Sequence, residues 1–80
     1  MANVTLRLFA SAREVAGTGS ITYEVDTVQE LLTRAENDLG EKFSDILSIS
    51  RVWINGEPLE GDSQISDGDE VAVLPPVSGG

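Results

Sequence analysis

One predicted helix constrains the fold of this chain more than any other part of its sequence. Thr27-Val28-Gln29-Glu30 matches a capping box, in which a threonine hydroxyl accepts a hydrogen bond from the backbone N–H three residues later. Gly40 stands where a glycine commonly ends a helix. Because a single amphipathic helix has to bury its apolar stripe, the rest of the chain must supply a sheet. The stripe consists of Val28, Leu31, Leu32, Ala35 and Leu39.

Short segments that alternate apolar and polar residues predict the strands of that sheet. Residues 4–9 and 21–25 alternate in this way and suggest a hairpin. Residues 51–54 form a third strand, and the following Asn55-Gly56 is the strongest short signal for a tight hairpin turn. Residues 57–59 return as a short strand, which Pro58 confines to an edge because proline cannot donate to a ladder.

The order of the elements predicts the fold class. Residues 70–74 form the last strand, and residues 11–16 and 43–47 add only short helical turns, so the order is β-β-α-β-β-β. We therefore expect an α+β fold in which a mixed β-sheet carries one main helix on one face, the ubiquitin-like β-grasp architecture. This domain is expected to span residues 1–74, followed by an extended C-terminal Gly-Gly tail over residues 75–80.

Composition excludes several kinds of function. The chain has no cysteine and no histidine, so we expect no bound metal and no permanently bound cofactor. A net charge of −9 argues against nucleic acid and favours a protein partner with a basic surface, although acidity also aids solubility. No apolar run approaches the ~18 residues of a membrane span, and the first residues lack a secretory signal. We expect a cytoplasmic protein without membrane contact.

The α-carboxylate of Gly80 is the distinctive reactive group of the chain. The tail that carries it narrows toward its end, which suits it to threading a tight channel: Pro75, Pro76, Val77, Ser78, Gly79. An ionised carboxylate is a poor electrophile, so it must first be activated, most simply as an acyl-adenylate made with ATP and Mg²⁺. A sulfur donor can then displace AMP and leave a terminal thiocarboxylate. The chain has no Walker-type phosphate loop, so the activating enzyme must be a partner.

Several motifs together resemble the small subunit of molybdopterin synthase, in the ubiquitin-like sulfur carrier family. The tail is the most diagnostic of them, and the resemblance spans essentially the whole chain. The other motifs are Leu8-Phe9-Ala10, Ala12-Arg13-Glu14, Ala16-Gly17, Thr27-Val28-Gln29-Glu30-Leu31, Val52-Trp53-Ile54-Asn55-Gly56 and Asp67-Gly68-Asp69-Glu70-Val71.

The resemblance implies a role in molybdenum cofactor biosynthesis. Gly80 would be adenylated by an E1-like enzyme, converted to a thiocarboxylate and inserted into the large synthase subunit. There the sulfur would pass to precursor Z, a cyclic pyranopterin monophosphate. The small subunit would donate sulfur without catalytic residues of its own, since those would belong to the large subunit.

Three apolar residues are candidates for the partner interface: Phe9, Leu59 and Leu74. If they share the helix-free face of the sheet, they form an exposed apolar patch near the tail, a usual sign of an interface. The alternative is that Phe9 bends inward and Leu59 joins the core. Trp53 and Tyr23 are interpreted as packing residues.

Three other functions remain open on the sequence. The chain fits a ubiquitin-like modifier whose activated Gly80 is joined to lysine amines of target proteins. It also fits a sulfur carrier for another pathway, such as thiazole synthesis or tRNA thiolation. The last possibility is an interaction module whose C-terminus does nothing.

Overall fold

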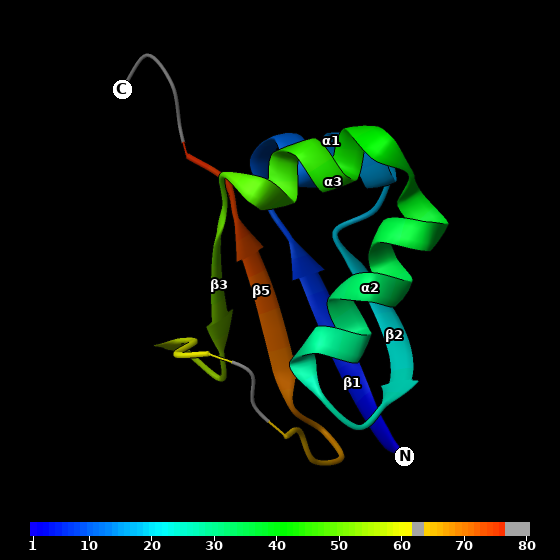
Figure 1. Ribbon diagram of the computed structural model, residues 1–80, viewed down its shortest axis with the longest axis vertical. Helices are drawn as coiled ribbons and strands as arrows, with labels where there is room; N and C mark the ends of the chain where they lie inside the picture. The colour runs from blue at the N-terminus through cyan, green and yellow to red at the C-terminus, as the bar shows by residue number, and fades with distance from the viewer. Residues whose placement is uncertain (62–63, 77–80) are drawn as a thin grey trace.

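The computed structural model describes residues 1–61 and 64–76 and shows a mixed sheet packed against helices (Figure 1). The first half of the chain alternates strands and helices, and three strands follow. The elements are β1 (Ala2–Leu8), α1 (Ala10–Ala16), β2 (Ser20–Val25), α2 (Val28–Leu39), α3 (Glu41–Ser48), β3 (Arg51–Ile54), β4 (Glu57–Pro58) and β5 (Glu70–Leu74).

The five strands of the sheet lie in the order β2-β1-β5-β3-β4. The central pair, β1 and β5, is parallel, whereas β1–β2, β5–β3 and β3–β4 are antiparallel. The hairpins predicted on either side of the helix are therefore both present, and β4 is the expected edge strand. The predicted ubiquitin-like β-grasp architecture and α+β class are confirmed.

Helix α2 begins and ends as predicted. The Glu30 backbone N–H donates to the Thr27 hydroxyl oxygen at 3.1 Å, and the Glu30 carboxylate accepts from the Asp26 N–H at 2.9 Å. Two donors at the helix start are thereby satisfied, an arrangement that stabilises helices by roughly 1 kcal/mol per cap. Gly40 ends the helix with φ of 90°, a conformation that residues with a Cβ rarely adopt.

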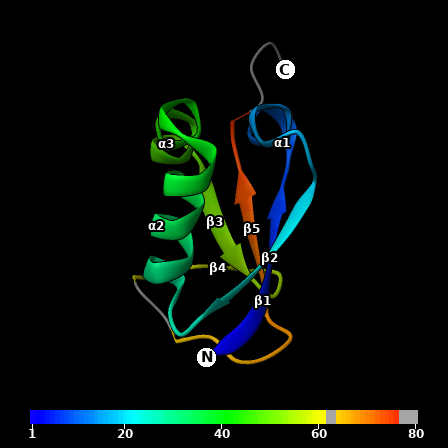
Figure 2. The same ribbon diagram turned by 90° about the vertical axis from the view of Figure 1, so that its right-hand side faces the viewer.

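The segment after Gly40 is more helical than predicted. The short turn expected near residues 43–47 is a helix of eight residues, α3, which starts directly after the Gly40 bend. Its Phe43 side chain is fully buried. Figure 2 shows that α2 and α3 lie on the same side of the sheet.

The core lies between these helices and the sheet. Alternate residues of β1 and β5 point into it, together with the α2 stripe and Phe43. Its members without exposed surface are Val4, Leu6, Ala12, Val25, Leu31, Ala35, Phe43, Val71 and Val73. One face of each central strand is thus committed to the core, which leaves the opposite face free of helices. Within the described residues, no helix is long and apolar enough to cross a membrane.

Tyr23 packs at the border of this core, as predicted. Only 7% of the residue is exposed, and its hydroxyl donates to the Asp38 carboxylate at 2.9 Å. The Arg34 guanidinium lies 5.9 Å from the ring centroid. Burial, helped by the hydrogen bond to Asp38 and the charge of Asp38, raises the pKa of Tyr23 to about 12.

We predict that alkaline pH destabilises the protein through Tyr23. The neutral phenol is favoured in the folded state, so its contribution to stability is present below the ordinary pKa of 10 and is lost as pH rises toward 12. The chain has one tyrosine, so absorbance titration should give a midpoint near 12 in the native protein and near 10 in urea. Tyr23→Phe should remove this part of the alkaline loss. A native midpoint near 10 would contradict the prediction.

Candidate functional site

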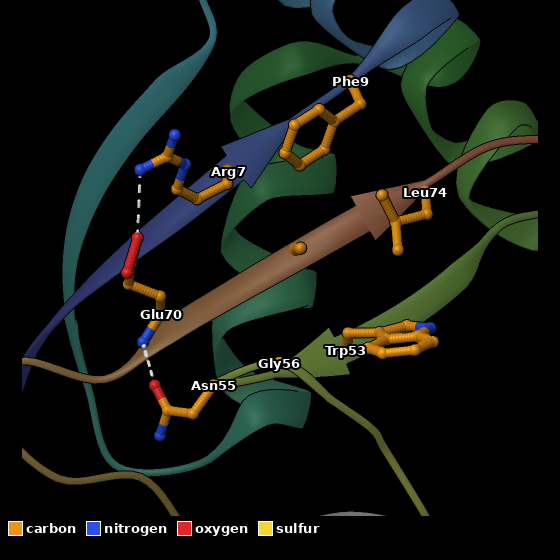
Figure 3. A pocket seen from close by; sticks show the side chains of 8 residues that line it. Arg7, Phe9, Trp53, Asn55, Gly56, Glu70 and Leu74 are labelled. Atoms are coloured by element: carbon orange, nitrogen blue, oxygen red, sulfur yellow. Dashed lines mark hydrogen bonds and ion pairs between the residues drawn. The ribbon is translucent and has the colours of Figure 1, made fainter.

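A groove of about 570 Å³ opens on the helix-free face of the sheet (Figure 3). It crosses the three neighbouring strands β1, β5 and β3 and reaches the turn after β3. The lining residues are Arg7, Phe9, Trp53, Asn55, Gly56, Glu70, Ala72 and Leu74. Figure 3 shows Phe9, Leu74 and Trp53 standing around the hollow, with the helices on the far side of the sheet.

The register of the strands explains why a hollow forms here. Arg7 of β1 and Trp53 of β3 both pair with Ala72 of the central strand β5. Residues that pair directly across strands lie on the same face of a sheet. The small Ala72 side chain is therefore flanked by long ones, and the floor of the groove lies where the central side chain is shortest.

Phe9 reaches the groove because it lies two residues after Arg7 and therefore shares its face of the sheet. Its backbone is extended, but the next residue, Ala10, has a positive φ of 51° that turns the chain into α1. Phe9 remains 41% exposed. The structure thus brings Phe9 and Leu74 together on the helix-free face, as the sequence predicted for these two residues.

Leu59 does not join them, which corrects its predicted place in the patch. Trp53 pairs with Pro58, so Pro58 is the β4 residue on the groove face. Leu59 follows one position later, is half-buried and packs against the core. The alternation of strand side chains between faces explains the difference, because a shift of one residue changes the face.

Trp53 is the aromatic lining residue that the sequence interpretation missed. It was interpreted as a packing residue, yet it is half-buried and lines the groove. Its neighbours Val52 and Ile54 pack against the core. Strand parity alone therefore carried the signal: an aromatic residue between two core-facing residues must point to the opposite face.

Polar contacts hold the end of the groove that lies farthest from the tail. The Arg7 guanidinium pairs with the Glu70 carboxylate at 3.1 Å. The Asn55 side-chain oxygen accepts from the Glu70 backbone N–H at 2.9 Å, and its amide donates to Asp69 at 3.0 Å. Hydrogen bonds from the Ser66 N–H and from Asn55 hold the pKa of the Asp69 carboxyl below its ordinary value.

The chain leaves the folded body beside this groove. Strand β5 ends at Leu74, Pro75 is buried and Pro76 is exposed. The predicted tail residues Val77, Ser78, Gly79 and Gly80 lie outside the described residues. Among the described residues, no group of three acidic, histidine or cysteine side chains could hold a metal ion. The groove offers apolar rings and hydrogen-bonded polar groups, an arrangement suited to docking rather than to bond chemistry.

The fold is that of the ubiquitin-like β-grasp proteins. The apolar groove lies beside its last strand, which leads toward Gly79-Gly80 in the sequence. The chain belongs to the ThiS family, whose model matches residues 6–80. The resemblance to the sulfur carrier family inferred from the motifs is therefore confirmed.

Three of the known proteins that are similar to this chain come from Dictyostelium and from two archaea. The molybdopterin synthase sulfur carrier subunit of Dictyostelium discoideum is 33% identical over 78 residues, which cover 91% of this chain and 91% of the relative. The crystal structure of SAMP1 from Haloferax volcanii is 30% identical with a TM-score of 0.86, covering 99% of this chain and 100% of the other. The solution structure of small archaeal modifier protein 1 (SAMP1) from Methanosarcina acetivorans is 31% identical with a TM-score of 0.77, covering 100% and 98%.

We predict that Asn55→Ala destabilises the protein by about 1–2 kcal/mol. The side-chain hydrogen bonds of Asn55 with Asp69 and Glu70 are lost. Residue 55 also has a positive φ, which alanine tolerates poorly. Asn37→Ala, an exposed change on α2, is the matched control and should cost nothing measurable. Urea denaturation measures both.

The same variant should alter the acid limb of the stability profile. A carboxyl whose folded pKa is lowered contributes stability above its ordinary pKa of 3.8, and this contribution is lost as pH falls through the folded value. Asn55→Ala weakens that contribution, so the gap between wild type and variant should narrow below pH 3.8. A gap that widens on acidification would contradict this role of Asp69.

Proposed function

We propose that this protein is a sulfur carrier that serves as the small subunit of molybdopterin synthase. One observation carries the proposal: the family match extends through residue 80 and includes the Gly79-Gly80 end. The Dictyostelium relative, described as a synthase sulfur carrier subunit, supports this pathway. The need for ATP favours the cytoplasm as the compartment.

The proposed chemistry takes place at the carboxyl group of Gly80. A carboxylate oxygen attacks the α-phosphorus of ATP, pyrophosphate leaves, and an acyl-adenylate forms. A sulfur donor at the oxidation level of sulfide then forms a C–S bond, the C–O bond to AMP breaks, and a thiocarboxylate remains. Its sulfur goes to precursor Z. An E1-like enzyme binds ATP and Mg²⁺, whereas this chain supplies the carboxyl group and the means of docking.

The proposed docking surface is the apolar part of the groove, formed by Phe9, Trp53, Ala72 and Leu74. It borders the strand that leads into the tail, so a partner seated on it has the tail within reach. The six tail residues span at most about 20 Å when extended, enough to reach a recessed active site. In this proposal residues 75–79 thread the channel of the large subunit, and Gly79 allows passage at its narrowest part.

A second function has a specific observation in its favour. Two of the solved structures with about 30% identity are small archaeal modifier proteins, one of them with a TM-score of 0.86. Modification of other proteins uses the same acyl-adenylate, which a lysine amine attacks in place of sulfur. The two functions therefore share their first step and are compatible in one protein.

Intact mass tests the sulfur-carrier proposal. After incubation with ATP, a sulfur source and the E1-like enzyme of the same organism, we expect a mass gain equal to exchange of one oxygen for one sulfur, mapped to Gly80. A variant lacking Gly79 and Gly80 should show no gain. No change in the wild type, with an enzyme competent on another carrier, would overturn the proposal. Higher-mass protein bands that need Gly80 would instead support modification.

We predict that the double change Phe9→Ser and Leu74→Ser weakens binding to the large synthase subunit more than tenfold, because it removes two apolar walls of the groove. Ile49→Ser is the matched control: Ile49 is an apolar residue, 65% exposed, that does not line the groove. It should leave affinity within about twofold. Titration calorimetry measures both, and equal affinities for the double variant and the control would refute this docking surface.

A further inference from the structure

The positive charges of this acidic protein are few, and two of them are engaged by other described residues. The chain carries five lysines and arginines against a net charge of −9. Arg7 pairs with Glu70, and Arg34 donates to the Glu24 carbonyl and lies over Tyr23. The other three, Arg13, Lys42 and Arg51, have exposed side chains without a hydrogen bond or ion pair to any described residue.

The sheet register places Arg51 beside the groove at the end nearest the tail. Arg51 pairs with Leu74 across β3 and β5, so both side chains lie on the same helix-free face. Leu74 is the last residue of β5 and a wall of the groove. Arg51 therefore carries a free positive charge at the point where the chain leaves the sheet.

The acidic residues at the other end of the groove do not balance this charge. Glu70 is held by Arg7, and Asp69 accepts hydrogen bonds from Ser66 and Asn55. In the register these two residues lie at the start of β5, whereas Arg51 lies opposite its end. The two ends of the groove therefore differ in charge. The acidic Glu70 and Asp69, which already have partners, lie at the end far from the tail, and the unpaired Arg51 lies beside the end near the tail.

We propose that Arg51 binds a carboxylate of the docking partner and thereby fixes the orientation in which the partner seats. The partner places an apolar side chain over Ala72, between Phe9, Trp53 and Leu74, and an aspartate or glutamate next to it on the tail side. This inference rests on the proposed docking of the large subunit and adds the chemistry that the partner must present.

Charge complementarity supports the choice of a carboxylate. The field of a protein with net charge −9 repels acidic surfaces at long range, so a partner is expected to be basic overall. A partner that is basic overall but has one acidic group opposite Arg51 is attracted by the net charge of this protein and also pairs with Arg51. Such an arrangement contributes more to specificity and register than to affinity.

The test compares two variants that make the net charge one unit more negative on opposite sides of the protein. Arg51→Gln removes the cation beside the groove, and Lys42→Gln removes an exposed cation on α3 that also lacks a partner among the described residues. Affinity of the full chain for the large synthase subunit is measured at low and at high salt, after matched melting curves show that both variants are folded.

We expect Arg51→Gln to bind about tenfold more weakly at low salt and to depend less on salt, with Lys42→Gln within twofold of wild type. Arg51→Glu should bind more weakly still, because two carboxylates then meet. Equal affinities of Arg51→Gln and Lys42→Gln, or of Arg51→Glu and Arg51→Gln, would overturn the inference and leave the docking surface standing. A wild type that fails to bind would overturn the docking proposal as well.

Discussion

The parallel pairing of β1 with β5 is the interaction on which the rest of the structure depends. It joins the first and last strands at the centre of the sheet and buries Leu6 and Leu8 beside Val71 and Val73. The same pairing sets the opposite face, where Arg7 lies next to Ala72. The register of β1 against β5 therefore sets both the core face and the groove face of the sheet. A shift of this register by one residue would exchange the side chains of the two faces. That coupling makes the docking face as strongly specified as the hydrophobic core.

Local signals predicted most of this fold, and the remainder depends on contacts that no local signal reports. The capping box, the α2 stripe and the Asn55-Gly56 turn each act within a few residues, so the sequence reveals them directly. Pairing between β1 and β5 joins residues more than sixty positions apart, and only the fold class suggested it. The length of α3 was underestimated because its apolar residues are few. Leu59 was misplaced because parity across the two-residue strand β4 is easily shifted by one position, and Trp53 was misplaced because the parity of β3 was not applied to it.

In the proposed function, the folded body and the carboxyl end have separate roles. The described residues of the groove provide rings, a small floor and hydrogen-bonded polar groups, which select the partner in the proposed function. The reactive group of the proposed mechanism is a backbone carboxyl, which any sequence could supply. Specificity in such a protein therefore resides in the surface that brings the carboxyl to the right enzyme, and the chemistry resides in that enzyme. This division offers a reason why sulfur carriers and protein modifiers can share one fold.

The burial of Pro75 has a further consequence. Proline has no N–H to extend the ladder, and this one is held within the body while Pro76 is exposed. The origin of the tail is thus fixed relative to the groove, and five residues remain beyond it, a contour of at most about 17 Å. Under the proposed function, this length limits the partner. An enzyme that binds the groove would need its catalytic centre within that distance of its own contact surface.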